Sequence, residues 1–195
     1  MYLFFDTETT GLPKKYNAPL DNFDNWPRLV QIAWILYDDK GKKILSKDYI
    51  IKPEGFTIPH ESSLIHGITT ERAIKDGCDL CDVLSEFEGL IDEADFLIGH
   101  NIDFDQKIMC VEFLRMGNEN CFNNKAVFCT MKASTNFCAI DSQYGYKWPK
   151  LSELHYKLFE KDFDEAHNAL KDIQITAKCF WEMKKRGIIN LIKES

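Results

Sequence analysis

Two carboxylates at the end of the first apolar run are the first residues whose type and spacing indicate chemistry. The run covers residues 2–5 and leads directly into Asp6 and Glu8, and a short apolar run of this kind is typical of a strand buried on both faces. Side chains at positions i and i+2 of a strand leave the same side. The two acids therefore repel each other at the edge of an apolar core, and a divalent cation such as Mg²⁺ or Mn²⁺ would stabilise both. The alternative is a solvated acidic turn.

Two further polar groups stand at the junctions of predicted elements. HNIDFD at residues 100–105 follows another apolar run, and HNALKD at residues 167–172 lies in the predicted last helix. Asp172 falls on a largely apolar helix face, where an acid needs a partner. We expect His167 at or before the first turn, from which it can reach the cleft that Asp172 enters. The alternative is an acid favoured by the helix dipole, with His167 as a capping or surface residue.

Taken together, these motifs resemble a known family. DTETTGL, HNIDFD and HNALKD, in this order and at these separations, resemble the three exonuclease motifs of the DnaQ-like (DEDDh) 3′→5′ exonucleases. PRLVQIAWILYD and IHGITTE resemble supporting segments of that family, so the resemblance covers nearly the whole chain. It implies a ribonuclease H-like fold, two divalent cations (Mg²⁺ or Mn²⁺), and hydrolysis of phosphodiester bonds from a 3′ end that releases nucleoside 5′-monophosphates.

The resemblance also assigns roles to particular residues. It places the metal-binding carboxylates at Asp6, Glu8, Asp105 and Asp172, and the general base at His167. Two metal ions roughly 3.5–4 Å apart can hold the attacking and leaving oxygens in line, and Asp6 is the candidate that bridges them. Glu8 and Asp172 are expected on the nucleophile-side ion, and Asp105 on the second ion, directly or through water. Histidine suits the proton transfer because its pKa lies near working pH.

The same resemblance implies a binding site for the 3′-terminal nucleotide. Leu12 is expected to contact the sugar or base, and Asn101 either touches the substrate backbone or braces the site. For His66 the alternative is a satisfied buried histidine. The predicted substrate-binding residues are Thr7, Thr10, Gly11, Leu12, Ile65, His66 and Asn101.

Two other segments could meet a nucleic acid. Tyr144, Tyr146, Trp148 and Lys150 form an aromatic and basic cluster in a stretch, residues 134–149 and their flank, that we predict to be irregular. The cluster either guides a single strand or caps the core. The long connector at residues 14–28 is polar with interspersed aromatics, which either stack on a base or pack over the sheet edge.

The elements that must position these residues predict an α/β fold. Apolar runs and turn signals indicate an α/β domain in which an antiparallel meander of three strands lies beside parallel strands, with helices packed on the sheet. The family resemblance implies that this is a ribonuclease H-like, mixed five-stranded sheet flanked by helices, with strands 1–3 antiparallel and strands 4–5 parallel. Parallel pairing of strands one and four would make the acid-bearing strand ends neighbours. Thr70 and Asp103 are predicted as helix N-caps. Strands are expected at 2–8, 29–37, 43–52, 95–100 and 126–129, and helices at 60–65, 79–91, 105–116, 150–158 and within 162–185.

Composition restricts the class of protein. A length of 195 residues with 45% hydrophobic residues predicts one compact domain, residues 1–195. The net charge of −7 argues against a broad basic face that coats nucleic acid. No apolar run is long enough to cross a membrane, and only Cys78 and Cys81 form a CxxC pair, so a cytoplasmic location is expected. The cysteines predicted to be reduced core residues are Cys110, Cys129, Cys138 and Cys179.

The predicted function is a metal-dependent 3′→5′ exonuclease whose partner is a nucleic acid 3′ end, single-stranded. A DNA enzyme of the proofreading type is the first choice and an RNA 3′-end trimming exoribonuclease the second, because no motif reveals a contact to a 2′-hydroxyl. The contrasting class is a non-catalytic, polymerase-associated binding module of the same fold. The complete set of acids and the histidine argue against that module.

Overall fold

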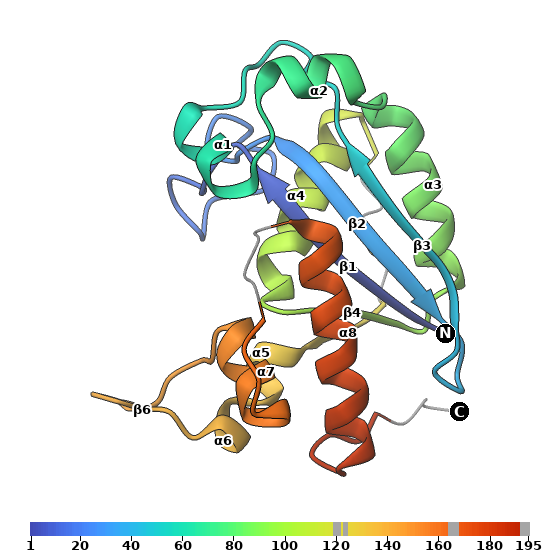
Figure 1. Ribbon diagram of the computed structural model, residues 1–195. Coiled ribbons are helices and arrows are strands. Elements are labelled where there is room, and N and C mark those ends of the chain that lie inside the picture. Colours follow the sequence, from blue (N-terminus) through green and yellow to red (C-terminus); the bar gives the residue numbers. More distant parts are fainter. Residues whose placement is uncertain (119–121, 123–124, 164–167, 192–195) are drawn as a thin grey trace.

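A mixed five-stranded sheet forms the centre of the protein (Figure 1). The computed structural model describes residues 1–118, 122, 125–163 and 168–191. The strands lie in the order β3-β2-β1-β4-β5. β1 pairs antiparallel with β2 and β2 with β3, whereas β1–β4 and β4–β5 are parallel, which confirms the predicted fold class. The strands are β1 (Tyr2–Thr9), β2 (Leu29–Tyr37), β3 (Lys43–Ile50), β4 (Phe96–Gly99) and β5 (Ala126–Cys129).

Helices cover both faces of this sheet (Figure 1). Phe5 points to the face covered by α3 and α4, where its ring lies 5.1 Å from that of Phe87. Phe4 points to the opposite face, covered by α7 and α8, with its ring 5.2 Å from Phe180. The apolar run therefore places β1 in the middle of both cores. The helices are α1 (His60–His66), α2 (Thr70–Asp76), α3 (Leu80–Glu93), α4 (Ile102–Arg115), α5 (Thr130–Ala133), α6 (Thr135–Cys138), α7 (Leu151–Phe159) and α8 (Ala169–Lys185).

Both predicted N-caps are wrong. Thr69 caps α2 by accepting a hydrogen bond from the Arg72 N–H, because the Thr70 hydroxyl instead accepts from the backbone N–H of Ile58 (2.9 Å). α4 begins at Ile102, three residues before the predicted start, so Asp103 lies in its first turn rather than at its cap. Asp103 forms an ion pair with Lys132 there.

The last helix lies within its predicted range, and one segment is more regular than predicted. Within the predicted range 162–185, α8 begins at Ala169 after the N-cap Asn168, whose side chain accepts from the Lys171 N–H. Residues 134–149 contain α6 and a small antiparallel hairpin, β6 (Asp141–Ser142) and β7 (Gly145–Tyr146), where we predicted irregular structure. Strands of two residues are too short to carry a hydrophobic period.

A buried ion cluster anchors the connector at residues 14–28. Glu112 of α4 is fully buried and accepts hydrogen bonds from Arg28 Nε (2.9 Å) and Arg115 Nη1 (2.9 Å). Arg115 also binds the connector, because it donates hydrogen bonds to the carbonyl oxygens of Phe23 (2.9 Å) and Trp26 (3.1 Å). The connector is thus fixed against α4, the helix that carries Asp105.

One cysteine differs from its predicted state. Cys110 is disulfide-bonded, although its apolar surroundings predicted a reduced thiol; a buried cysteine and a half-cystine look alike in sequence. Cys78, Cys81, Cys129, Cys138 and Cys179 are free. None of the described helices combines the length and the apolar character that a membrane span requires.

Candidate active site

Three carboxylates from two distant parts of the chain converge at one edge of the sheet. Asp6 and Glu8 leave the same side of β1, and Asp172 joins them from the first turn of α8. One ligand oxygen from each side chain lies within 4.8 Å of the other two. α8 packs along β1 and β2, so the apolar face of this helix is what delivers Asp172 to the end of the strand.

A fourth carboxylate reaches the same place from the other face of β1. Asp105 lies in the first turn of α4, directly after β4, and is only 4% exposed. The parallel pairing of Phe4 with Ile98 brings the end of β4 beside the end of β1. Thr7 donates both its backbone N–H (3.0 Å) and its hydroxyl (2.7 Å) to Asp105 Oδ1.

The electrostatics of the cluster are those of crowded, buried acids. Burial raises the pKa of Asp6 well above its usual value, and the charges of Asp105, Glu8 and Asp172 raise it further. Burial, followed by the charges of Asp172 and Asp105, raises the pKa of Glu8 to about 8. Burial raises the pKa of Asp105 to about 7, against the two hydrogen bonds from Thr7 that lower it. Such a set of carboxylates without a compensating cation is unfavourable.

The donor set fits a hard divalent cation. All the converging ligands are carboxylate oxygens, which suit Mg²⁺ and Mn²⁺ rather than the softer ions that prefer sulfur or imidazole. A bound dication would favour the ionised form of each acid and so remove the repulsion that raises their pKa values. Asp6, Glu8 and Asp172 are the residues that could hold it together, with Asp105 beside them.

Gln31 is a site residue that the sequence reasoning missed. It is buried on β2 opposite Glu8 and accepts a hydrogen bond from the backbone N–H of Ala169 (3.4 Å), the first residue of α8. Its amide nitrogen donates to Asp48 Oδ1 (2.7 Å) on β3. Gln31 therefore connects the strand beside Glu8 to the helix turn that carries Asp172. The available signal was one amide within the otherwise apolar run LVQIAWILY.

The turn after β1 is covered by α1. Gly11 has φ +143°, a conformation that side chains rarely adopt, and lies against Ser62 of α1. His66 is buried at the end of α1, accepts a hydrogen bond from the Ile68 N–H (3.2 Å) and contacts the backbone of Thr9. Burial lowers the pKa of His66, so it is neutral at pH 7.

Of the remaining predicted substrate-binding residues, some have exposed side chains and others have side chains that already form hydrogen bonds within the protein. Leu12 and Ile65 are mostly exposed, at 73% and 58%, on the turn and on α1. The Thr10 hydroxyl accepts from the Arg28 N–H (2.9 Å), and the Thr7 hydroxyl is committed to Asp105. Asn101 is exposed and holds the left-handed conformation (φ +70°) at the start of α4.

The predicted general base, His167, lies outside the described residues. The described helix begins next to it, with Asn168 as N-cap. Asp172 is in the first turn of this helix. The predicted position and role of His167 remain predictions.

The comparison with protein families decides the class of this chain. Residues 3–180 match the exonuclease family RNase_T. The chain belongs to this exonuclease family. The resemblance to the DnaQ-like (DEDDh) 3′→5′ exonucleases that the motifs indicated is thereby confirmed.

Relatives of this chain include much longer proteins. DNA polymerase III PolC-type from Staphylococcus aureus (strain bovine RF122 / ET3-1) is 27% identical over 197 aligned residues, which cover 97% of this chain and 12% of the polymerase. The same protein from strain MW2 matches with the same identity and coverage. The chain thus spans about an eighth of the length of these curated relatives.

Solved structures show the same fold. Escherichia coli exonuclease I in complex with a dT13 oligonucleotide superposes with a TM-score of 0.75 at 20% identity, covering 95% of this chain and 41% of that one. The zinc-bound form of an E. coli exonuclease I–ssDNA complex gives a TM-score of 0.74 at 20% identity, covering 95% and 40%. These likenesses concern the fold alone.

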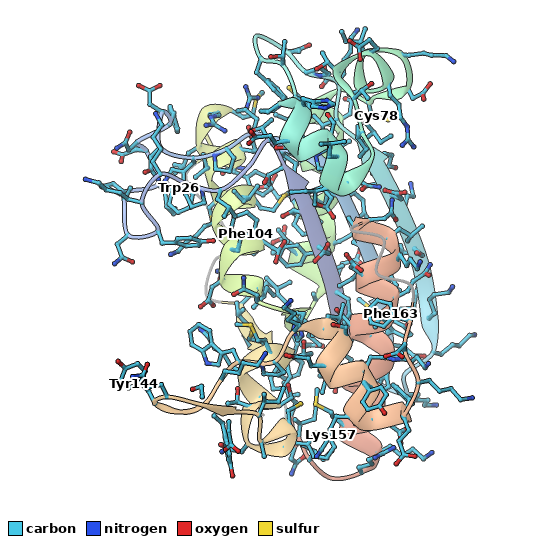
Figure 2. The ribbon with its side chains drawn as sticks, turned by 60° about the vertical axis from the view of Figure 1, so that its left-hand side comes forward. Trp26, Cys78, Phe104, Tyr144, Lys157 and Phe163 are labelled. Carbon is cyan, nitrogen blue, oxygen red and sulfur yellow. The ribbon has the colours of Figure 1, made fainter. Side chains whose placement is uncertain are left out.

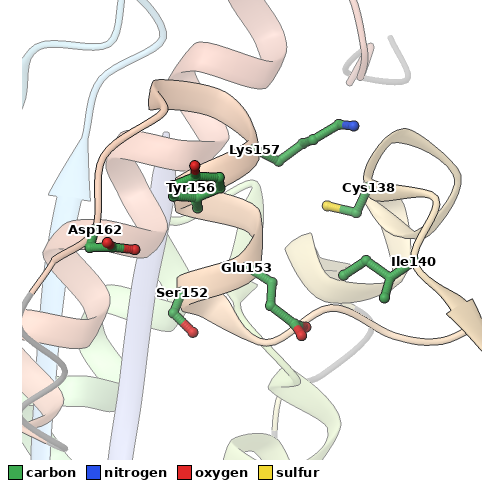
Figure 3. A pocket seen from close by; sticks show the side chains of 7 residues that line it. All are labelled: Cys138, Ile140, Ser152, Glu153, Tyr156, Lys157 and Asp162. Carbon is green, nitrogen blue, oxygen red and sulfur yellow. The ribbon is translucent and has the colours of Figure 1, made fainter.

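The chain also has a cavity apart from the acids. It has a volume of about 440 Å³ and lies at α7, where Cys138 and Ile140 face Glu153 and Lys157 (Figure 3). Its lining includes none of the four clustered carboxylates. The cavity therefore does not belong to the candidate active site.

Proposed function

We propose that this chain is a metal-dependent 3′→5′ exonuclease that releases nucleoside 5′-monophosphates from the 3′ end of single-stranded nucleic acid. Family membership supports the reaction class. The single observation that carries the proposal is the convergence of Asp6, Glu8 and Asp172, with Asp105 buried beside them. Carboxylates with raised pKa values in one place are typical of a functional site.

The proposed chemistry is hydrolysis at a phosphodiester. Two divalent cations, Mg²⁺ or Mn²⁺, would supply charge to the phosphoryl oxygens and the leaving oxygen when bound. Asp6, Glu8, Asp105 and Asp172 would hold them. His167 would take the proton from the attacking water, because the acids are committed to cations. The buried His66, with the exposed Leu12 of the turn after β1 and the exposed Ile65 of α1, would seat the terminal nucleotide.

DNA is the proposed first substrate, and RNA the second. The relatives carry the names of a DNA polymerase and of an exonuclease with a bound dT13 oligonucleotide, which favours DNA. The similarity to a polymerase chain also favours association with a polymerase.

The test is a digestion panel read as ladders. Single-stranded and double-stranded DNA and RNA, labelled at the 5′ or the 3′ end, are incubated with the protein and Mg²⁺, Mn²⁺ or a chelator. We expect a ladder from 5′-labelled single-stranded DNA, release of labelled mononucleotide from 3′-labelled DNA, and neither with chelator. Internal cuts, or shortening from the 5′ end, would contradict the proposal.

A pair of neighbouring acids on α4 provides a matched control. Asp105→Asn should lower turnover by at least about a thousandfold, because it removes a group that acts only with its partners. Asp103→Asn alters an exposed acid two residues away, and should stay within about twofold of wild type on a dinucleotide. Asp172→Asn should behave like Asp105→Asn. Equal activity of the Asp105 and Asp103 variants would remove the assignment of Asp105.

A binding module is the second candidate, favoured by the match to a polymerase. It predicts that the chain binds an oligonucleotide but shortens none of the panel's substrates with any cation. Co-purification with a polymerase in the absence of any hydrolysis would favour the module over the enzyme.

A further inference from the structure

An aromatic hairpin projects from the body of the protein. Residues 141–149, here called the aromatic arm, contain β6 and β7, and the hairpin extends away from the sheet (Figure 1). Tyr144 lies at its far end (Figure 2) and is 93% exposed, Trp148 is 61% exposed and Tyr146 is half exposed. These exposures exclude the core-capping role that the sequence left open. Several exposed aromatic rings gathered on one segment indicate a candidate interaction surface.

The base of the arm is fixed rather than loose. His100 Nε2 lies 3.0 Å from the Pro149 carbonyl oxygen, and His100 Nδ1 lies 3.0 Å from Thr130 Oγ1. The Lys147 N–H donates to the Ile140 carbonyl (2.9 Å), which closes the hairpin. His100 directly follows β4, the strand that leads to Asp105. The arm is therefore held against the active-site end of the sheet.

Contacts connect the arm to the carboxylates. The Lys132 ammonium lies over the Trp148 ring, 6.0 Å from its centre, and forms an ion pair with Asp103 in the first turn of α4. Asp103 precedes Asp105 by two residues. Trp148 thus lies beside the helix turn that carries a catalytic acid, with a cation between them.

The same side of the molecule carries a second aromatic surface. Phe104 lies between the connector loop that bears Trp26 and the arm that bears Tyr144 (Figure 2). The rings of Phe104 and Tyr16 are 6.5 Å apart, and the Lys107 ammonium binds the Tyr16 carbonyl (3.1 Å). Aromatic rings with interspersed lysines are the pattern by which proteins bind single strands.

We propose that the aromatic arm stacks on unpaired bases upstream of the 3′ terminus, and so makes single strands the preferred substrate. The direction of the strand rests on the proposed function. Stacking tolerates any base sequence because every base has a π face. Paired bases in a duplex already stack on their neighbours, so the arm discriminates against duplex ends. Lys132, about half exposed beside Trp148 and ion-paired with Asp103, is the cation of this surface that a backbone phosphate would meet.

Binding without hydrolysis gives the first test. Fluorescence anisotropy in chelator measures the affinity for a labelled oligothymidylate of about twenty nucleotides and for a blunt DNA hairpin. Trp148→Ala and Tyr144→Ala should each weaken binding of the single strand by about tenfold, and Trp148→Phe should restore most of it. Tyr156→Ala removes another ring, 54% exposed on α7, and should bind like wild type. The blunt hairpin should bind all variants alike.

Hydrolysis gives the second test and separates this inference from the proposed function. Trp148→Ala should raise KM for the long single strand by about tenfold and leave hydrolysis of the p-nitrophenyl ester of thymidine 5′-monophosphate unchanged. A wild-type protein that hydrolyses neither substrate would contradict the proposed function, while the anisotropy result would still decide the role of the arm.

Four results would overturn the role of the arm, and three of them concern oligonucleotides or the ester. These are equal affinity of the Trp148 and Tyr156 variants for the single strand, an equal loss of affinity for the blunt hairpin, and a changed rate on the nitrophenyl ester. A shift in sedimentation of the arm variants without any change in oligonucleotide binding would show that the rings contact another protein copy instead, which also overturns it.

Discussion

Thr7 donates two hydrogen bonds, from its backbone N–H and from its hydroxyl, to the same oxygen of Asp105. Because strand side chains alternate, Thr7 faces α4 while its neighbours Asp6 and Glu8 face α8. One tripeptide of β1 therefore supplies two acids on one face and positions a third acid from the other. Thr7, predicted to bind substrate, is buried and acts on Asp105 in this structure.

Thr7→Val should weaken metal binding rather than abolish the fold. The hydroxyl bond lowers the pKa of Asp105, so its loss should raise that pKa and disfavour the ionised ligand. Loss of such an outer partner lowers metal affinity by about 10–100-fold. The measurement is the Mg²⁺ concentration for half-maximal activity, with Thr7→Ser as the control that keeps the hydroxyl. An unchanged Mg²⁺ requirement would show that the hydroxyl does not act through Asp105.

Gln31→Leu should disturb the start of α8. It leaves the Ala169 N–H without its acceptor, which costs about 1–3 kcal/mol of the free energy of unfolding, and lets Asp172 shift. We expect kcat to fall by about tenfold, since small displacements of a catalytic group are costly. Gln174→Leu, at an exposed position on the same helix, should change neither quantity. A Gln31 variant that loses stability but keeps kcat would indicate a purely structural role.

Glu112→Gln should destabilise the protein without acting on the chemistry. It leaves Arg28 and Arg115 without the charge of a fully buried partner, and breaking such a pair costs about 3 kcal/mol. Tm should fall by about 6–12 °C, measured by thermal unfolding. Glu182→Gln alters a more exposed Glu–Arg pair on α8 and should cost less than about 1 kcal/mol. Similar Tm losses in both variants would contradict the importance of burial.

Stability without metal should fall as pH rises from about 6.5 to about 8.5. Folding raises the pKa of Asp6, of Glu8 to about 8 and of Asp105 to about 7, so in this window the folded chain binds more protons than the unfolded chain. The free energy of unfolding therefore decreases with pH, by about 2 kcal/mol. Burial lowers the pKa values of His66, His100 and His155. These histidines therefore make stability rise with pH, but mainly below this window.

Added Mg²⁺ should cancel this pH dependence, because a bound cation favours the ionised acids. Thermal unfolding at both pH values, with chelator and with Mg²⁺, measures the effect. The rise in Tm on adding Mg²⁺ should be larger at the higher pH. Equal slopes with and without the cation would mean that these acids do not hold it.

Apolar runs between turn signals were enough to predict the sheet. The bounds of β2 and β5 match their predicted ranges, because both are short apolar runs with abrupt polar flanks. The convergence of acids from residues 6, 8, 105 and 172 could also be expected, since parallel pairing of β1 and β4 makes their ends neighbours. The predicted roles of these residues remain predictions until activity is measured.

The two wrong N-caps and the missed Gln31 concern side chains that can bind more than one partner. Thr69 and Thr70 are equally good caps in sequence, and only the position of Ile58 decides that Thr70 is taken elsewhere. Asp103 looks like a cap, but Lys132 on a distant helix is its partner. Gln31 could be noticed as an isolated amide, yet nothing local in the sequence indicates Ala169 as its partner.

The acids of the site come from opposite ends of the sequence, and this has a consequence for the newly made polypeptide. Asp6 is synthesised well before Asp172, which arrives with α8, the helix that completes the core on its face of β1. An incompletely folded chain cannot assemble the cluster. If the chain has the proposed activity, hydrolysis would therefore report the folded fraction directly.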